Sequence, residues 1–78
     1  MSSGDEVAGE FMHEFYKARE KFAPFNSAHE GYAVIKEELD ELWDEIKKKS
    51  EQRSPATMRG EAIQIGAMAL AFIIDLNL

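Results

Sequence analysis

The chain has 78 residues, a formal net charge of −6 and no cysteine, and 45% of its residues are hydrophobic. This length allows one domain, residues 1–78, whose small core leaves a monomer marginally stable, and without cysteine no disulfide or thiolate-bound zinc adds stability. Association of copies is the remaining common solution, and the negative charge argues against nucleic acid as a partner because phosphates are bound by Lys and Arg.

The first expected helix covers about residues 5–22. Ser3 and Glu6 have the spacing of a capping box at its start. The polar, acidic N-terminus has neither the basic nor the apolar segment of a signal peptide, so we expect a cytoplasmic protein. Ala23-Pro24 then breaks the helix. The apolar stripe of this first helix repeats every three or four residues and consists of Val7, Phe11, Phe15, Ala18 and Phe22.

The second expected helix begins after Ser27, which forms another capping box with Glu30, and ends in three lysines, residues 47–49. Carboxylates lie along the edge of its apolar face, where partial desolvation favours a nearby cation. The apolar seam consists of Tyr32, Ile35, Leu39, Leu42 and Ile46, with Trp43 expected mostly in the core. The edge beside it consists of Val34, Glu38, Glu41 and Glu45.

The third expected helix starts near Pro55, with Ser54 as its cap, and continues to about Leu76. Its apolar run, residues 65–74, is shorter than the ~20 residues of a membrane span, so we expect a buried core helix and no membrane partner. No strand pattern is present. The predicted fold is all-α: a three-helix, antiparallel, hairpin-type protomer that assembles into a helical-bundle homodimer or homotetramer.

Acidic side chains on the second and third helices carry the functional prediction. Glu38 and Glu41 are three residues apart on one helix, and Glu61 and Gln64 are three apart on the next. Residues at this spacing share a helix face, so two antiparallel helices can direct these four side chains at one point. Oxygen ligands of this kind suit Mg²⁺, with Mn²⁺ as a substitute, and Mg²⁺ commonly acts through a substrate phosphate.

Simpler interpretations remain open at this stage. The helical carboxylates can be solvated surface residues, and Glu61 can be a favourable charge in a helix's first turn. Gln64 can satisfy a hydrogen bond between helices. Glu10 and His13 match the E-x-x-H of di-iron bundles, but a second copy of the motif and two further glutamates would have to come from elsewhere.

At these residues the chain resembles the MazG-like all-α nucleoside triphosphate pyrophosphohydrolases, whose pattern is E-E-x-x-E, a spacer, then E-x-x-D. Glu37, Glu38 and Glu41 match the first part, and Glu61 matches the second after 19 intervening residues. The likeness covers about residues 28–76, and residues 25–32 resemble short members found in viral genomes. The departure is Gln64, where the family has aspartate.

The resemblance implies Mg²⁺-dependent hydrolysis of a (deoxy)nucleoside triphosphate to the monophosphate and pyrophosphate, which clears surplus or non-standard nucleotides. Glu38, Glu41 and Glu61, with Gln64 at the fourth position, would hold the metal, and Glu38 would thereby be catalytic. Glu37 would act as the base or as a ligand of a second metal. His29 is a candidate for contact with the substrate. Arg59, Lys36, or a basic residue of the first helix such as Lys17 or Arg19 would bind the phosphates, and nothing in the sequence chooses among these cations.

Two other functions remain open from the sequence. A non-catalytic helical oligomer that binds nucleotide or metal is favoured by Gln64 and by the short segment after the third helix. A phosphoribosyl-ATP pyrophosphohydrolase is the alternative among enzymes. Aromatic residues of the first helix, or Trp43, belong to the core or stack on a nucleobase.

Overall fold

A computed structural model describes residues 3–78, and within that range the chain is all-helical, with three α-helices and no strand. The α-helices are α1 (Gly4–Lys21), α2 (Ala28–Ile46) and α3 (Pro55–Asp75), and a short 3₁₀ helix, η1 (Ser50–Gln52), lies between α2 and α3. The expected helix boundaries are confirmed to within about a residue, except that α2 ends at Ile46, before the three lysines expected at its end.

Each α-helix begins at the serine expected from the sequence. The hydroxyl of Ser3 accepts a hydrogen bond from the backbone N–H of Glu6, Ser27 from that of Glu30, and Ser54 from that of Thr57, each at 3.1 Å. These contacts satisfy N–H groups that have no partner inside the helix. The caps therefore fix the residue at which each helix starts.

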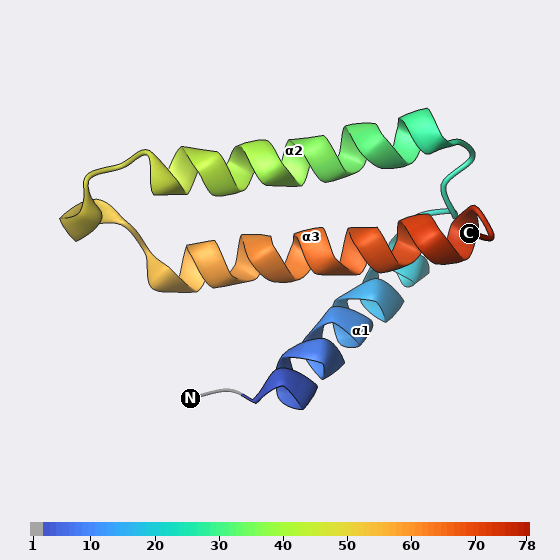
Figure 1. The fold of residues 1–78 in the computed structure, drawn as a ribbon, viewed down its shortest axis with the longest axis horizontal. Coiled ribbons are helices and arrows are strands. Elements are labelled where there is room, and N and C mark those ends of the chain that lie inside the picture. The colour runs from blue at the N-terminus through green and yellow to red at the C-terminus, as the bar shows by residue number, and fades with distance from the viewer. Residues whose placement is uncertain (1–2) are drawn as a thin grey trace.

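Helix α3 is the central element (Figure 1). Helix α2 runs antiparallel to it, the loop that contains η1 joins the end of α2 to the start of α3, and α1 crosses α3 obliquely. Both α1 and α2 pack against α3. The antiparallel hairpin of α2 and α3 sets their facing side chains against each other, and this geometry brings distant carboxylates together.

The core lies where α1 crosses α3. It is built from Phe15, Ala67 and Ala71, which are at most 8% exposed. Small residues on α3 permit this close approach: a Cβ added at Gly66 would come within 2.6 Å of the Phe11 ring. Gly66 therefore allows α1 to cross directly over α3, as the small residues of the third helix suggest.

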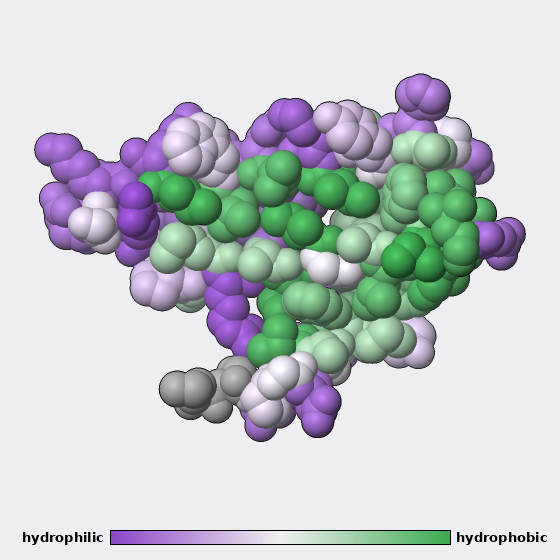
Figure 2. Space-filling model, viewed as in Figure 1, coloured by the Kyte–Doolittle hydropathy of each residue, from purple (hydrophilic) through white to green (hydrophobic). Residues whose placement is uncertain are grey.

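Part of the expected core lies on the surface of the protomer. Tyr32 is 64% exposed, Leu39 49% and Trp43 58%, so only Ile35, Leu42 and Ile46 of the predicted seam are half-buried. Phe22, the last residue of the predicted stripe on α1, is 70% exposed because the helix has ended by that point. Figure 2 shows hydrophobic surface across the middle of the visible face, with hydrophilic side chains around it.

Helix α3 is less covered than the sequence suggests. Ile73 and Ile74, inside the expected buried run, are about half exposed. Among the described residues α3 alone is long and apolar enough to cross a membrane, a test that core helices of globular proteins also pass, and 17% of its most apolar window is buried. One protomer leaves much of the apolar surface of α3 uncovered.

Candidate metal centre

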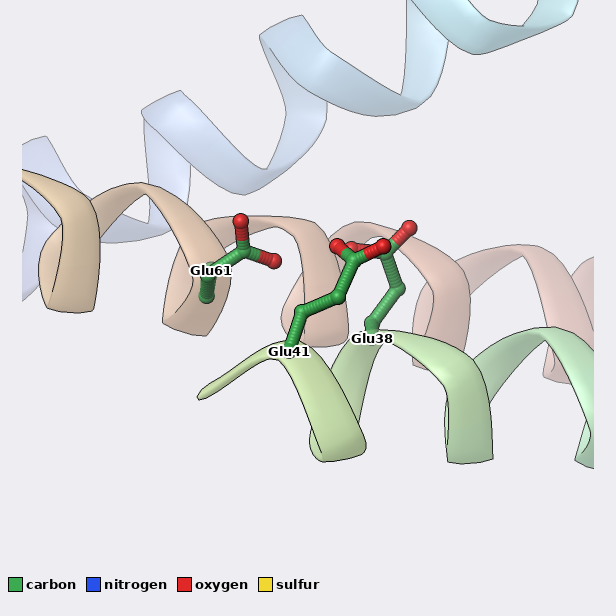
Figure 3. A group of neighbouring side chains, drawn as sticks. All are labelled: Glu38, Glu41 and Glu61. Atoms are coloured by element: carbon green, nitrogen blue, oxygen red, sulfur yellow. The ribbon is translucent and has the colours of Figure 1, made fainter. Parts of the chain in front are cut away.

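Three carboxylates converge between α2 and α3. One oxygen from each of Glu38, Glu41 and Glu61 lies within 4.8 Å of the other two. Figure 3 shows Glu38 and Glu41 rising from α2 and Glu61 from α3, with their carboxyl groups in the space between the helices. This is the only group of at least three acidic, histidine or cysteine side chains with that geometry within residues 3–78. The structure thus brings together the three glutamates that the sequence singled out.

One oxygen of this group lacks a protein partner. The Oε2 atom of Glu61 is buried and has no hydrogen-bond donor among the described residues. Its neighbours in the cluster are carboxylates, which donate a hydrogen bond only when protonated. A buried acceptor of this kind costs free energy unless a proton or a cation satisfies it.

Crowding shifts the acid–base behaviour of the cluster. Burial, together with the hydrogen bond to Glu61 and the charges of Glu41 and Glu61, raises the pKa of Glu38 to about 7. The pKa of Glu41 is also raised, first by its hydrogen bond to Glu61 and then by the charge of that residue. Without a cation the cluster therefore retains a proton near neutral pH.

The donor set fits a hard divalent cation. Mg²⁺ and Mn²⁺ prefer carboxylate oxygens, and oxygens bound to one such ion are separated by about 3–4 Å, whereas the three oxygens here lie within 4.8 Å of one another without an ion. An ion at this point would supply the positive charge that the unpartnered Glu61 oxygen lacks. We therefore treat Glu38, Glu41 and Glu61 as the candidate metal centre.

Glu45, the fourth residue on the predicted edge of α2, serves another purpose. Its buried carboxylate accepts hydrogen bonds from the backbone N–H of Ser54 at 2.7 Å and from Lys48 Nζ at 3.0 Å. The bond from Ser54, followed by that from Lys48, lowers the Glu45 pKa. Glu45 thus ties the end of α2 to the start of α3 and aligns the helices that carry the metal centre.

Gln64 lies beside the centre, and its amide nitrogen binds α1. Its Nε2 donates to Oε2 of Glu14 at 2.8 Å, and this bond is the main reason that the Glu14 pKa is lowered. The hydrogen bond between helices that the sequence allowed is therefore present. The carbonyl oxygen of the amide is the only atom with which Gln64 can bind metal, and that role stays a prediction.

A cavity of about 520 Å³ is lined by Glu38, one of the three glutamates of the cluster. Its apolar wall includes Phe15, Phe22, Phe25 and Met68, and Glu37, Glu38 and Gln64 lie on its polar wall. This volume is in the range of small-molecule sites. Glu38 belongs to both the cavity and the metal centre, so it is the residue that connects them.

The remaining residues predicted for the site are dispersed. Glu37 lines the cavity outside the carboxylate cluster. Lys36 is exposed and bound to Asp40 at 2.7 Å, and His29 is exposed in the first turn of α2. Arg59 Nη1 donates to Glu10 Oε1 at 2.7 Å, and its Nη2 binds the other Glu10 oxygen. Lys36, His29 and Arg59 do not line the cavity, so their contact with substrate stays a prediction.

Two acidic residues that the sequence analysis did not single out hold the cavity together. Glu14 orients Gln64, as described above, and Asp75 is bound by Arg19 and by the backbone N–H of Phe25 at 2.9 Å. The Asp75 side chain is 4% exposed. A negative charge at the C-terminal end of a helix interacts unfavourably with the helix dipole. The position of Asp75 at the end of an apolar helix was therefore the signal in the sequence that it has a cationic partner.

Comparison of the chain with protein-family models, with curated proteins and with solved structures gives no match. The motif and the geometry of these side chains are therefore the features of the chain that bear on its function.

Proposed function

We propose that this protein is a cytoplasmic, metal-dependent nucleoside triphosphate pyrophosphohydrolase of the MazG-like kind. Its reaction is hydrolysis of a (deoxy)nucleoside triphosphate to the monophosphate and pyrophosphate. The observation that carries the proposal is the continuity between the carboxylate cluster and the cavity through Glu38. The phosphate groups of a nucleotide can lie at the metal bound by the carboxylate cluster while its base lies in the cavity.

The metal would be held by Glu38, Glu41 and Glu61, with Mg²⁺ as the physiological ion and Mn²⁺ as its substitute. When bound, the ion neutralises phosphate charge and activates water for attack on phosphorus. The unpartnered oxygen of Glu61 supports this assignment because three carboxylates without a cation repel one another.

Other residues would bind and orient the substrate. Glu37, on the cavity wall beside Glu38, is placed to accept a proton from water. Phe22 and Phe25 offer apolar surface for a base. Lys17 and Lys21 line a smaller cavity of about 210 Å³ that shares Gln64 with the larger one, so these two cations of α1 are the candidates for contact with the phosphates.

A second copy of the chain is part of the proposal. Tyr32, Leu39 and Trp43 lie on one face of α2 and are all about half exposed or more. The protomer exposes 5613 Å², whereas a compact chain of this mass exposes about 4,800 Å². The excess of roughly 800 Å² matches what one partner buries in a standard interface. We therefore propose a homodimer, with a tetramer as the next closed assembly.

Activity is tested with a panel of ribonucleotides, deoxynucleotides and phosphoribosyl-ATP, with Mg²⁺, with Mn²⁺ or with EDTA. Pyrophosphate should form only with metal. Glu41→Gln and Glu61→Gln should each lower kcat by about 100-fold or more, since each removes a charged ligand while keeping its shape. Glu51→Gln, an exposed residue of η1, is the matched control and should leave the rate unchanged.

The product identifies the bond that is cut. Orthophosphate in place of pyrophosphate would overturn the proposed reaction, and metal-independent turnover would overturn the role of the carboxylates. Turnover of phosphoribosyl-ATP alone would select the alternative enzyme.

A non-catalytic nucleotide-binding oligomer is the second candidate. The observation that favours it is the neutral Gln64, whose amide nitrogen is held by Glu14 where the MazG-like pattern has a carboxylate. Calorimetry distinguishes the two functions: tight nucleotide binding in the presence of Mg²⁺ without pyrophosphate release supports the binding protein.

A further inference from the structure

The nitrogen donors on the wall of the 520 Å³ cavity are largely engaged within the protein. Arg19 binds Asp75 and lies over the Phe15 ring, with its guanidinium carbon 4.9 Å from the ring centroid. The backbone N–H of Phe25 donates to the same carboxylate. Gln64 Nε2 donates to Glu14. A ligand that enters the cavity therefore meets few free donors.

The acceptors on this wall are available by contrast. Because the Glu14 carboxylate requires a donor, the NH₂ group of Gln64 faces Glu14 and its carbonyl oxygen remains for another partner. At the corner between α1 and α2, Glu30 Oε1 accepts the backbone N–H of Asn26 at 3.0 Å. Glu30 Oε2 has only a long contact, 3.5 Å, with the Asn26 side-chain amide. Glu30 and Asn26 both line the cavity, so Oε2 of Glu30 and Oδ1 of Asn26 are the acceptors that these two neighbouring residues can offer to a ligand.

This acceptor pair lies where a nucleobase would lie. Glu30 and Glu38 both line the cavity and are eight residues apart on α2, which corresponds to about 12 Å along the helix. A nucleotide whose phosphates are at Glu38 extends its base towards this corner. The aromatic rings of Phe22 and Phe25 line the same corner.

We propose that the cavity selects cytosine and adenine, which carry an amino group at C4 and C6, over uracil and hypoxanthine, which carry a carbonyl oxygen at the same position, through the acceptors of Glu30 and Asn26. An amino group offers two hydrogens to two acceptors. Uracil and hypoxanthine offer one ring N–H beside a carbonyl oxygen, and that oxygen would face a carboxylate without a donor. This inference rests on the proposed function for turnover, but the binding preference does not require catalysis.

The test uses two matched pairs of nucleotides, dCTP with dUTP and ATP with ITP, each differing by the replacement of an amino group with a carbonyl oxygen. We expect kcat/KM to favour the amino member of each pair by about tenfold or more. Binding of dCMP and dUMP, measured by calorimetry with Mg²⁺ present, should show the same order.

Glu30→Gln is the decisive variant. Glutamine can still accept the Asn26 N–H with its one oxygen, and it replaces the second acceptor with a donor. The ratio of dCTP to dUTP turnover should fall by about tenfold or invert, whereas Glu51→Gln on η1 should leave it unchanged. A thermal unfolding curve of Glu30→Gln with the wild-type midpoint excludes loss of the fold as the cause.

Each outcome decides a separate point. Pyrophosphate release from all four nucleotides without preference, or with a preference for the carbonyl member, overturns the inference and leaves the proposed function standing. If no nucleotide is hydrolysed, the proposed function fails, and the comparison of dCMP with dUMP still decides the inference: equal binding, or no binding of either, overturns it.

Discussion

At the scale of single residues, the cluster of Glu38, Glu41 and Glu61 is a source of local instability in the free protein. Three carboxyl groups share a partly buried space, and one oxygen of Glu61 has no donor. Burial and like charges there favour the protonated form. Such local instability is typical of a binding site, because the ligand supplies the stabilisation that the protein lacks.

This cluster predicts an unusual dependence of stability on pH. The pKa of Glu38 is about 7 in the folded protein, above its ordinary value of 4.5. The stability linked to its proton is therefore complete below 4.5 and is lost as pH rises through about 7. Without metal, the free energy of unfolding should fall by on the order of 1 kcal/mol between pH 5 and 8, a figure reduced to allow for partial exposure.

Thermal unfolding with EDTA measures this effect. Glu38→Gln should flatten the profile between pH 5 and 8, and Mg²⁺ or Mn²⁺ should raise the wild-type midpoint at pH 8. Below pH 4.5 the slope should reverse, because the pKa values of Glu14 and Glu45 are lowered and protonation removes the hydrogen bonds that they accept. A flat profile for the wild type above pH 5 would mean that the three glutamates do not interact.

At the scale of elements, α3 organises the protomer because α1 and α2 both pack against it. Glycines mark the closest contacts. Gly66 lies beneath the Phe11 ring, and Gly31 at the start of α2 meets Phe72 at the end of α3. Helix α1 carries part of the cavity wall, including Phe15 and Arg19. The packing of α1 on α3 therefore determines the shape of the cavity next to the metal centre.

Two alanine substitutions on α3 separate packing from helix propensity. Alanine normally stabilises a helix interior by about 0.5–1 kcal/mol relative to glycine. Gly60→Ala should show this gain because nothing lies within 4 Å of the added Cβ. Gly66→Ala should instead destabilise by about 1–3 kcal/mol, since its Cβ would come within 2.6 Å of the Phe11 ring.

Urea unfolding of the two variants gives both values. Equal stabilisation by the two substitutions would show that α1 does not cross α3 at Gly66. Gly66→Ala should also weaken nucleotide binding, because a displaced α1 moves Phe15 and Arg19 on the cavity wall.

At the scale of the whole molecule, one protomer leaves too much apolar surface uncovered for so short a chain. Exposed aromatic and aliphatic side chains line α2, and two isoleucines near the end of α3 are also exposed. A second copy that covers α2 would complete a bundle of helices. The proposed dimer follows from this surface and from the limited core of 78 residues.

Disruption of that face tests the assembly. Leu39→Glu and Trp43→Glu place a charge on the exposed side of α2, so each should convert the dimer to a monomer and lower the midpoint of thermal unfolding. Glu51→Lys changes the charge of an exposed residue on η1, outside this face of α2, and it is the control. Sedimentation velocity across a concentration series reports the mass, and a monomeric wild type at all concentrations would contradict the proposal.

The sequence alone determined the helices and the three glutamates that meet. Serine caps, the proline breaks and the three- and four-residue apolar repeats are local signals, so they fix helix ends and faces without tertiary information. The i and i+3 spacing likewise places Glu38 beside Glu41 on α2.

Only the tertiary structure decided which side chains pair across helices and which apolar residues stay exposed. The bonds from Gln64 to Glu14 and from Arg19 to Asp75 join residues 50 and 56 positions apart, and no local pattern specifies them. Leu39 and Trp43 match a core repeat but lie outside because α3 covers only one side of α2. Periodicity identifies an apolar face, whereas the packing of neighbouring helices decides how much of that face is buried.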